Sequence, residues 1–367
     1  MTIDQKYMQR AISLAKRGMG WVNPNPMVGA VLVKDGLIIG EGFHEYFGGP
    51  HAEVNALRSV KEPSDETIAG ATLYVTLEPC SHEGKTPPCA KLIAEKKITR
   101  VVIGMADPNP LVNGSGISFL KSEGIAVEVG LMEQRIRELN EVFTKFITTG
   151  MPFVVLKTAM TLDGKIATVT NASRWITGEP SRNLVHRMRQ QLSAVMVGVD
   201  TVLYDDPLLN IRLKGSWKNP LKVIADTQGR IPLESKVLIN DPQLTIVATT
   251  RLADPEKLKN IERAGAQVLI CPVKDHKADL RFVMKSLGTM GIDSVMIEGG
   301  STLAFSVLQE RLVDKVVSFM APKILGGASA PTAVGGSGIA SMDKAINLVN
   351  LRTRKVGNDL MIEGWIE

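Results

Sequence analysis

Short apolar runs alternate with helical patterns through residues 153–320, and this alternation limits the fold more than any other feature of the chain. The strand-like runs lie at 153–160, 194–199, 221–225, 244–249, 267–271, 294–297 and 315–320. Helical spacing of apolar residues is found at 180–192, 255–264, 279–290 and 301–312. Strands that alternate with helices favour a mostly parallel sheet with helices on both faces. We therefore expect an α/β domain over this part of the sequence.

The first 150 residues begin with a helical pattern and continue with a hairpin signal, Asp35-Gly36, between two apolar runs. Further strands are expected at 71–77, 100–105 and 126–130, and one long helix at 133–147. A helix stop at 148–150, followed by Pro152, marks a boundary. The length of 367 residues suits two domains. We predict domains over 1–147 and 148–367, and two final strands around Gly357-Asn358.

Composition limits the expected location and partners. No stretch reaches the roughly 18 apolar residues of a membrane helix, and the charged N-terminus lacks the apolar region of a signal peptide. Three cysteines are too few for a disulfide framework. A net charge of +5 is mild for this length, suits an anionic small molecule and does not by itself indicate nucleic acid. We expect a cytoplasmic protein with reduced thiols, a small-molecule substrate, no nucleic-acid partner and no membrane contact.

One histidine and two cysteines form the most specific local pattern. His51-Ala52-Glu53 is followed by Pro79-Cys80 and then by Cys89. One imidazole and two thiolates are good zinc ligands, and three protein ligands leave a fourth position open, as in catalytic sites. Zinc deaminases use the pattern H-x-E…P-C-x-x-C, in which the glutamate moves protons and is not a ligand. The sequence therefore predicts Zn²⁺ on His51, Cys80 and Cys89, with Glu53 as the catalytic base.

This pattern leaves alternatives open. Eight residues separate Cys80 from Cys89, where the general pattern has two, so a structural zinc site or two unrelated cysteines also fit. His82 offers a fourth ligand that would close the site, or it lies in a substrate loop. Cys271, within an apolar strand pattern, is expected in the core. A nucleic-acid base deaminase and a zinc-stabilised binding module are the rival functions. Against the first, the chain has no basic tail and few aromatic residues for stacking bases. Against the second, a structural zinc site has no use for Glu53.

Longer motifs resemble those of one family, the bifunctional deaminase and reductase of riboflavin biosynthesis. In the first domain these are NPNPMVGA (23–30), GGPHAE (48–53), LEPCSHEGKTPPC (77–89), DPNP (107–110) and GSG (114–116). In the second they are LKTAMTLDGKIA (156–167), SRWITG (173–178), GVDTVLYDDPLLNIR (198–212), IEGGSTL (297–303) and APKILGG (321–327). The resemblance covers nearly the whole chain in one order, and it makes the eight-residue cysteine spacing a supporting feature.

The resemblance implies both fold and activity. It implies an N-terminal cytidine-deaminase-like α/β/α layer domain and a C-terminal dihydrofolate-reductase-like α/β domain. The first would hydrolytically deaminate 2,5-diamino-6-(5-phosphoribosylamino)pyrimidin-4(3H)-one to 5-amino-6-(5-phosphoribosylamino)uracil with zinc. The second would reduce the ribosyl chain with NADPH, which gives 5-amino-6-(5-phosphoribitylamino)uracil. A homo-oligomer, dimer or tetramer, is also expected.

The resemblance also implies which residues bind the substrates. In the deaminase, polar residues of the motif loops would hold the base and the ribose phosphate: Asn23, His44, His82, Lys85 and Asn109. In the reductase, the substrate would contact Lys157, Ser173, Arg189, Leu209, Arg212 and Glu298. The planar guanidinium groups of Arg189 and Arg212 suit a phosphate. The proton donor of the reduction stays open among Lys157, Asp205 and Glu298.

The cofactor site of the second domain needs a separate argument, because the Rossmann pattern G-x-G-x-x-G does not follow its first strand. Residues 298–302 end a strand and open a helix, where glycines and free N–H groups suit a pyrophosphate. The expected cofactor residues are Ala159, Trp175, Thr201, Asp205, Thr227, Gly299, Gly300, Ser301 and Thr302. No clamp for a 2′-phosphate is evident, so the preference for NADPH over NADH rests on the resemblance.

Overall fold

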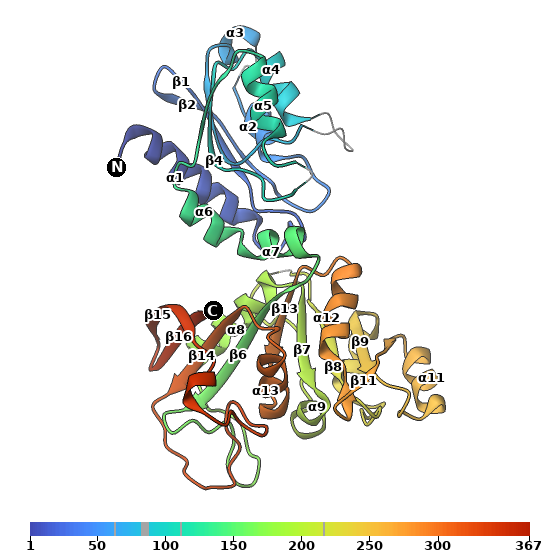
Figure 1. Cartoon of the computed structure of the whole chain (residues 1–367). Helices are drawn as coiled ribbons and strands as arrows, with labels where there is room; N and C mark the ends of the chain where they lie inside the picture. Colours follow the sequence, from blue (N-terminus) through green and yellow to red (C-terminus); the bar gives the residue numbers. More distant parts are fainter. Residues whose placement is uncertain (62–63, 82–87, 111, 216) are drawn as a thin grey trace. The chain divides into compact units, whose positions relative to one another are not determined.

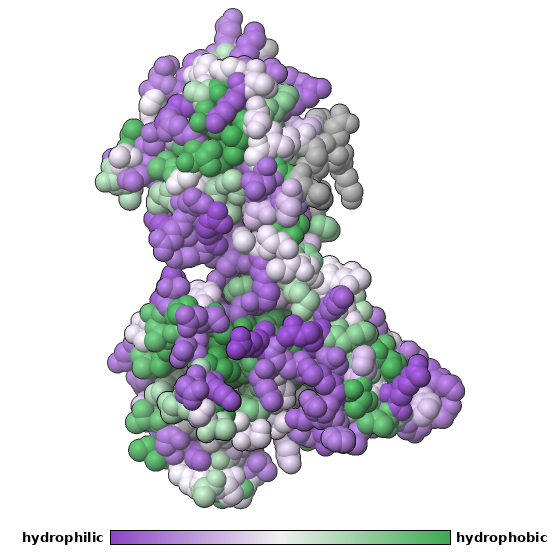
Figure 2. All heavy atoms as spheres, viewed as in Figure 1, coloured by the Kyte–Doolittle hydropathy of each residue, from purple (hydrophilic) through white to green (hydrophobic). Residues whose placement is uncertain are grey.

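The chain divides into two folded units at the end of helix α7 (Glu141–Thr149). The computed structural model describes residues 1–61, 64–81, 88–110, 112–215 and 217–367. Unit 1 spans Met1–Gly150 and unit 2 spans Met151–Glu367 (Figure 1). Unit 1 ends at Gly150, whose left-handed backbone ends α7 after Thr149. The visible surface of both units mixes hydrophilic residues with small hydrophobic patches (Figure 2).

Unit 1 is built on a five-stranded sheet with the order β2-β1-β3-β4-β5. Its strands are β1 (Gly29–Lys34), β2 (Leu37–Phe43), β3 (Thr72–Leu77), β4 (Arg100–Met105) and β5 (Ala126–Val129). The hairpin partner β2 and strand β3 both pair antiparallel with β1, whereas β3, β4 and β5 are parallel. The predicted hairpin and strands of the first domain are therefore confirmed.

Helices cover both faces of this sheet because successive residues of its strands point to opposite sides. On one face, Val31 packs in a core with residues of α1 (Ile3–Ala15), α6 (Glu133–Leu139) and α7. On the other, Leu32 packs in a core with residues of α2 (Ala52–Arg58), α4 (Cys89–Glu95) and α5 (Ser115–Ser122). The short elements η1 (Lys16–Gly18) and α3 (Asp65–Ile68) complete the described part of the unit. The expected α/β/α layers are present.

The single helix expected at 133–147 is wrong in one respect, since the structure has two helices that meet at Asn140. The side chain of Asn140 accepts a hydrogen bond from the Met27 N–H at 2.8 Å and donates one to the Met27 carbonyl at 3.0 Å. This contact joins residues 113 positions apart, so local helical periodicity could not reveal it.

Unit 2 contains a nine-stranded sheet with the order β10-β9-β8-β7-β13-β6-β14-β16-β15. Its strands are β6 (Phe153–Thr161), β7 (Ala194–Gly198), β8 (Leu221–Ala225), β9 (Thr245–Thr249), β10 (Gln267–Ile270), β13 (Ser294–Glu298), β14 (Lys315–Ala321), β15 (Leu348–Val356) and β16 (Asp359–Ile366). From β10 to β14 all neighbours are parallel, and β16 and β15 are antiparallel additions. The predicted parallel sheet and final strand pair are confirmed.

Helices also cover both faces of the second sheet. One core joins it to α12 (Leu280–Thr289) and α13 (Ser301–Gln309), and it includes Cys271, as predicted. The other core joins it to residues of α8 (Glu179–Gln191), α9 (Val199–Asp205), α10 (Lys236–Ile239) and α11 (Pro255–Arg263). Two short 3-10 helices, η2 (Pro242–Leu244) and η3 (Met342–Lys344), lie in connections. No helix among the described residues is both long and apolar enough to span a membrane.

Several short elements of unit 2 were not predicted, namely the helices α9 and α10, the two 3-10 helices and a small hairpin. Strands β11 (Val273–Lys274) and β12 (Lys277–Ala278) form an antiparallel hairpin between β10 and α12. Each strand has only two residues, so the alternation of apolar and polar residues that identifies a strand has no room to appear.

Candidate active sites

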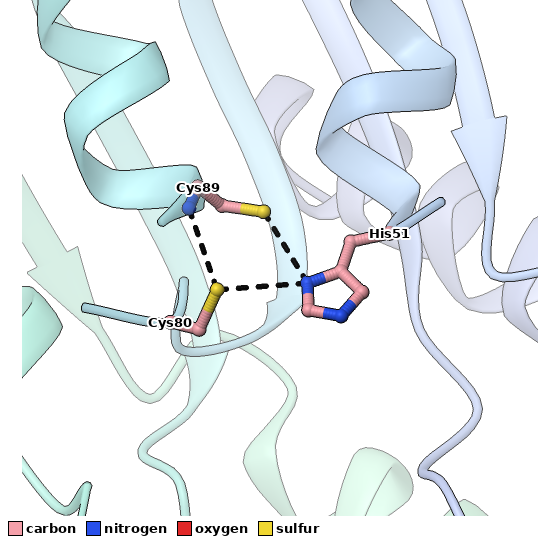
Figure 3. A group of neighbouring side chains, drawn as sticks. All are labelled: His51, Cys80 and Cys89. Atoms are coloured by element: carbon pink, nitrogen blue, oxygen red, sulfur yellow. Dashed lines mark hydrogen bonds between the residues drawn. The ribbon is translucent and has the colours of Figure 1, made fainter. Parts of the chain in front are cut away.

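The three predicted metal ligands of unit 1 converge from three elements (Figure 3). His51 is the N-cap of α2, Cys80 lies just beyond β3, and Cys89 is the first residue of α4. The Nδ1 atom of His51 lies 3.5 Å from the Cys80 Sγ atom and 3.4 Å from the Cys89 Sγ atom. A tetrahedral zinc site with ordinary bond lengths holds nitrogen and sulfur about 3.6 Å apart. The donor set and its spacing therefore fit Zn²⁺.

The pKa values of the two thiols are shifted in opposite directions. Hydrogen bonding by Cys89 lowers the pKa of Cys80 to about 4, and the nearby His51 acts in the same direction. The pKa of Cys89 is raised, mainly by its hydrogen bond to Cys80. The first N–H of α4, that of Cys89, donates to the Cys80 sulfur at 3.3 Å. This contact at the start of the helix favours a thiolate at Cys80.

Glu53 lies beside the metal ligands in the first turn of α2. Its side chain is only 3% exposed, and this burial raises the pKa of the carboxyl group to about 7. A hydrogen bond with Cys89 and the proximity of His51 act in the opposite direction. His51 and Glu53 thus both lie at the start of α2. A carboxyl group with a pKa near neutrality can both accept and return a proton.

His44 lies next to the metal ligands, and its ring meets that of His51 edge-on with centroids 5.8 Å apart. Its Nδ1 atom is 3.0 Å from the Pro50 carbonyl, which can only accept, so Nδ1 carries the proton. Its Nε2 atom then accepts from the Asn25 amide at 3.1 Å. Burial lowers the pKa of His44, which favours this neutral form. Asn25 is a residue that the sequence reasoning missed, although it stands in the same motif as Asn23.

A second missed residue is Glu78, which immediately precedes Pro79-Cys80. Its buried carboxylate accepts four backbone N–H groups at 2.9–3.1 Å, those of Asp107, Gly114, Gly116 and Ile117. Two of these donors belong to the first turn of α5, whose N-terminus favours a negative charge. Glu78 thereby fastens the 107–117 segment, which carries Asn109, to the strand end that presents Cys80.

The other predicted deaminase residues are Asn23, Asn109, His82 and Lys85. Asn23 and Asn109 are half-buried in loops, and the Asn109 N–H donates to the Asp107 carboxylate at 2.9 Å. His82 and Lys85 lie outside the described residues.

A cavity of about 1620 Å³ in unit 2 is lined by every residue that the sequence predicts for the reductase. It lies where the carboxyl ends of β6, β7, β8 and β13 come together, the usual ligand site of a parallel sheet. Its predicted lining residues are Lys157, Ala159, Ser173, Trp175, Arg189, Thr201, Asp205, Leu209, Arg212, Thr227, Glu298, Gly299, Gly300, Ser301 and Thr302. The structure thus brings together residues from six separate segments of the sequence.

Three charged residues, Arg189, Glu298 and Lys157, lie together in one part of this cavity. Arg189 from α8 forms two hydrogen bonds with Glu298 at the end of β13, at 2.6 and 3.0 Å, and a third to the Asn210 carbonyl at 2.9 Å. Burial would raise the pKa of Glu298, but Arg189 prevails and lowers it to about 2. Lys157 is in register with Glu298 on the neighbouring strand β6. Burial lowers the pKa of Lys157, and Glu298 acts against this effect.

The guanidinium group of Arg212 makes fewer hydrogen bonds within the protein than that of Arg189. Its guanidinium donates to the Asn210 side chain at 3.0 Å, and its backbone N–H donates to the His186 Nδ1 atom at 3.4 Å. Burial, together with Arg189 and Arg212, lowers the pKa of His186 to about 4, so this ring is neutral at pH 7. Arg212 therefore keeps more donors free for a substrate phosphate than Arg189 does.

The residues predicted for the cofactor form a concave, backbone-lined part of the same cavity. Gly299 and Gly300 have φ values of +72° and +78°, a backbone conformation that residues with a side chain rarely adopt. A Cβ atom at Gly299 or Gly300 would lie 3.3 or 3.6 Å from Thr201 Oγ1. Beyond them, Ser301 begins α13 and leaves its first N–H groups without partners in the helix. This cradle fits the pyrophosphate of a dinucleotide. Ser173 donates to Asp205 at 2.9 Å, and Arg182 stacks on the Trp175 ring at 4.6 Å.

Two family models match the chain in the order of its units. The model described as "Cytidine and deoxycytidylate deaminase zinc-binding region" matches residues 1–105, and "RibD C-terminal domain" matches residues 152–362. The expected deaminase-like and reductase-like folds are thereby confirmed.

Known proteins resemble the chain over its full length. The riboflavin biosynthesis proteins RibD of Actinobacillus pleuropneumoniae and Aquifex aeolicus are 45% and 44% identical over 98% of this chain, and the alignments cover 94% and 98% of those proteins. The structure of Acinetobacter baumannii RibD, form 1, matches with a TM-score of 0.89 at 38% identity, covering 100% of this chain and 99% of that one. The deaminase/reductase of Thermotoga maritima matches with a TM-score of 0.86 at 41% identity and the same coverage. The chain therefore belongs to the RibD family of bifunctional riboflavin biosynthesis proteins, which unite a zinc-binding deaminase with a reductase.

Proposed function

We propose that the deaminase predicted at 1–147 occupies unit 1, that the reductase predicted at 148–367 occupies unit 2, and that the residues described above carry the two steps. The first step converts 2,5-diamino-6-(5-phosphoribosylamino)pyrimidin-4(3H)-one to 5-amino-6-(5-phosphoribosylamino)uracil. The second reduces the ribosyl chain with NADPH and yields 5-amino-6-(5-phosphoribitylamino)uracil. The observation that carries the first assignment is the His51, Cys80 and Cys89 cluster with the buried Glu53 beside it.

In the deaminase, His51, Cys80 and Cys89 would hold zinc, which supplies a water molecule of lowered pKa as the nucleophile. As the oxygen of that water bonds to C2 of the pyrimidine, Glu53 would accept its proton and pass it to the 2-amino group, which leaves as ammonia when its bond to C2 breaks. The pKa of about 7 suits both transfers, because the carboxyl group binds and releases the proton with similar ease. His44, fixed in one tautomer by Pro50 and Asn25, orients the pyrimidine together with Asn23, Asn109, His82 and Lys85.

In the reductase, the cavity of unit 2 would hold the ribosyl substrate against NADPH, which supplies the hydride. Arg212 and Arg189 bind the substrate phosphate, and Ser173 and Leu209 complete that side. As hydride reaches C1′, the bond from C1′ to the ring oxygen breaks and that oxygen needs a proton. Glu298 is an unsuitable donor because its pKa of about 2 leaves it ionised. Lys157 beside it is the donor that we propose, since burial lowers the pKa of its ammonium group.

Product analysis by mass spectrometry tests this assignment. We expect wild-type protein without NADPH to stop at the deaminated ribosyl compound, and to reach the ribityl compound when NADPH is added. Glu53→Gln, which keeps the side-chain shape but cannot accept a proton, should block only the first step. Lys157→Met should block only the second, with the deaminated compound accumulating. The proposal fails if zinc-loaded wild-type protein leaves the diaminopyrimidine unchanged, or if Glu53→Gln still deaminates it.

Two further expectations accompany this function. A homo-oligomer, dimer or tetramer, is to be checked by light scattering coupled to size-exclusion chromatography. A cytoplasmic location is to be checked by fractionation of the source cells.

A further inference from the structure

A pair of lysines projects from the β11–β12 hairpin into the lining of the unit 2 cavity. Lys274 pairs directly with Lys277, and the two residues between them, Asp275 and His276, have φ values of +49° and +62°. Two consecutive positive φ values define the tight two-residue turn of a hairpin. Residues directly opposite in such a ladder place their side chains on the same face, about 5 Å apart. The hairpin therefore holds two ammonium groups side by side.

This face of the hairpin lies against helix α13. The Lys277 Nζ atom is 3.4 Å from the Ser306 hydroxyl, and the Lys274 Nζ atom is 3.2 Å from the Glu310 carboxylate. Helix α13 begins at Ser301, beside the glycines proposed to hold the pyrophosphate. Ser306 lies five residues further along, which is about 7.5 Å along the helix axis at 1.5 Å per residue. That distance is of the size of one ribose unit. The lysines are thus placed one sugar away from the cradle.

A second contact joins the hairpin to the cofactor region. The Ala278 N–H donates to the Thr227 hydroxyl at 3.1 Å, and Thr227 was predicted to contact the cofactor. Thr227 and both lysines line the same cavity as Gly299 and Gly300. The hairpin is therefore fastened to the turn after β8 on one side and to α13 on the other.

Not every basic side chain on this side of the cavity has a carboxylate partner. Arg230 pairs with Asp200 at 2.7 Å, and Lys236 pairs with Asp206 at 3.2 Å. Lys274 forms an ion pair with Glu310, whereas Lys277 has no carboxylate partner among the residues that the structure describes. Two like charges directly opposite in a ladder repel each other. An anionic ligand between them would remove that repulsion.

We propose that Lys274 and Lys277 bind the 2′-phosphate of the cofactor's adenosine ribose and so make the reductase select NADPH over NADH. This rests on the proposed reductase function of unit 2. The 2′-phosphate is a compact anion with several acceptor oxygens, which matches two ammonium groups. NADH carries a neutral hydroxyl at that position and gains nothing from them.

The test compares two adenosine probes by isothermal titration calorimetry on the full chain. The probes are 2′,5′-ADP, which carries the 2′-phosphate, and 5′-ADP, which does not. In Lys277→Met and in Lys274→Met/Lys277→Met, the side-chain stems remain and the charges are removed. We expect 2′,5′-ADP to bind at least tenfold more weakly in the double variant, and 5′-ADP to bind as in wild type. Lys285→Met, on the exposed surface of α12, is the matched control and should change neither.

Steady-state kinetics provides the second readout. In the double variant the KM for NADPH should rise at least tenfold while kcat and the KM for NADH stay near wild type. Both lysines are exposed, so the thermal midpoint is expected to be unchanged. Equal binding of 2′,5′-ADP by wild type and double variant overturns the proposal, and so does equal weakening of both probes. If the wild-type protein reduces the deaminated substrate and the variants still prefer NADPH to NADH, the role proposed for the two lysines is wrong but the reductase function stands. If the wild-type protein neither binds nor uses NADPH, both proposals are wrong.

Discussion

Arg189 and Glu298 form a two-bond ion pair inside the unit 2 cavity, with Nε to Oε1 at 2.6 Å and Nη2 to Oε2 at 3.0 Å. Each side chain is about 10% exposed. The pair joins α8 to the end of β13, so it holds two walls of the cavity together. A buried charge that loses its partner is strongly unfavourable, whereas a neutral replacement of both partners is tolerated.

Glu298→Gln should therefore lower the free energy of unfolding of unit 2 by about 3 kcal/mol, because Arg189 keeps its charge and loses its counter-ion. Urea unfolding followed by tryptophan fluorescence measures this, since three of the four tryptophans, Trp175, Trp217 and Trp365, lie in unit 2. Arg189→Gln/Glu298→Gln should recover part of the loss, because neither charge remains. A single variant as stable as wild type would contradict the prediction.

The stability of unit 2 should fall on acidification between about pH 6.5 and pH 4, because of His186. Burial and the neighbouring arginines lower its pKa to about 4 in the folded state, whereas an unfolded histidine titrates near 6.5. Between these values the unfolded chain binds more protons, so stability rises with pH and falls as pH is lowered. Unfolding midpoints at half-unit pH steps measure the slope. His186→Asn keeps an acceptor for the Arg212 N–H and should flatten it; identical slopes would show that other groups are responsible.

Glu78→Ala should weaken unit 1 and impair substrate binding by the deaminase. Four backbone N–H groups lose a charged acceptor, and such bonds are worth about 1.5–3 kcal/mol each before water replaces part of them. We expect a loss of at least about 3 kcal/mol in the stability of unit 1 and a raised KM, since the segment with Asn109 is no longer held. Circular dichroism during urea unfolding and deaminase kinetics are the measurements. Glu95→Ala, on the exposed side of α4, should change neither quantity.

Removal of the metal should separate the two activities. All three predicted ligands lie in unit 1, and the described residues of unit 2 contain no comparable cluster. Dialysis against a zinc chelator should abolish deamination and leave NADPH-dependent reduction of the deaminated compound intact. Cys80→Ser should lower the zinc content to near zero, whereas Cys271→Ser, in the core of unit 2, should leave it at wild-type level. Zinc retained by Cys80→Ser would speak against this ligand set.

The sequence predicted those parts of the molecule whose signal is local. Strands and helices of unit 2 follow from apolar periodicity, and the placement of His51 and Glu53 follows from their spacing at a helix start. The role of Glu78 was not predictable in this way, because its donors lie 29 to 39 residues further along the chain. The break at Asn140 depends on Met27, and the β11–β12 turn uses Asp275 and His276 without a glycine. These three features arise from a tertiary contact or from an unusual backbone angle.

The strand orders of the two sheets imply that the two units complete folding at different times during synthesis. Unit 1 has every sheet strand within its first 129 residues, so its sheet can close once the chain has passed Gly150. In unit 2, the first strand β6 lies between β13 and β14, and its pairing partners are translated more than 130 residues later. Such long sequence separations slow the closure of a sheet. A ribosome that stalls near residue 290 would therefore carry a finished deaminase followed by an open, apolar β6, and this nascent state is where the chain most needs protection from aggregation.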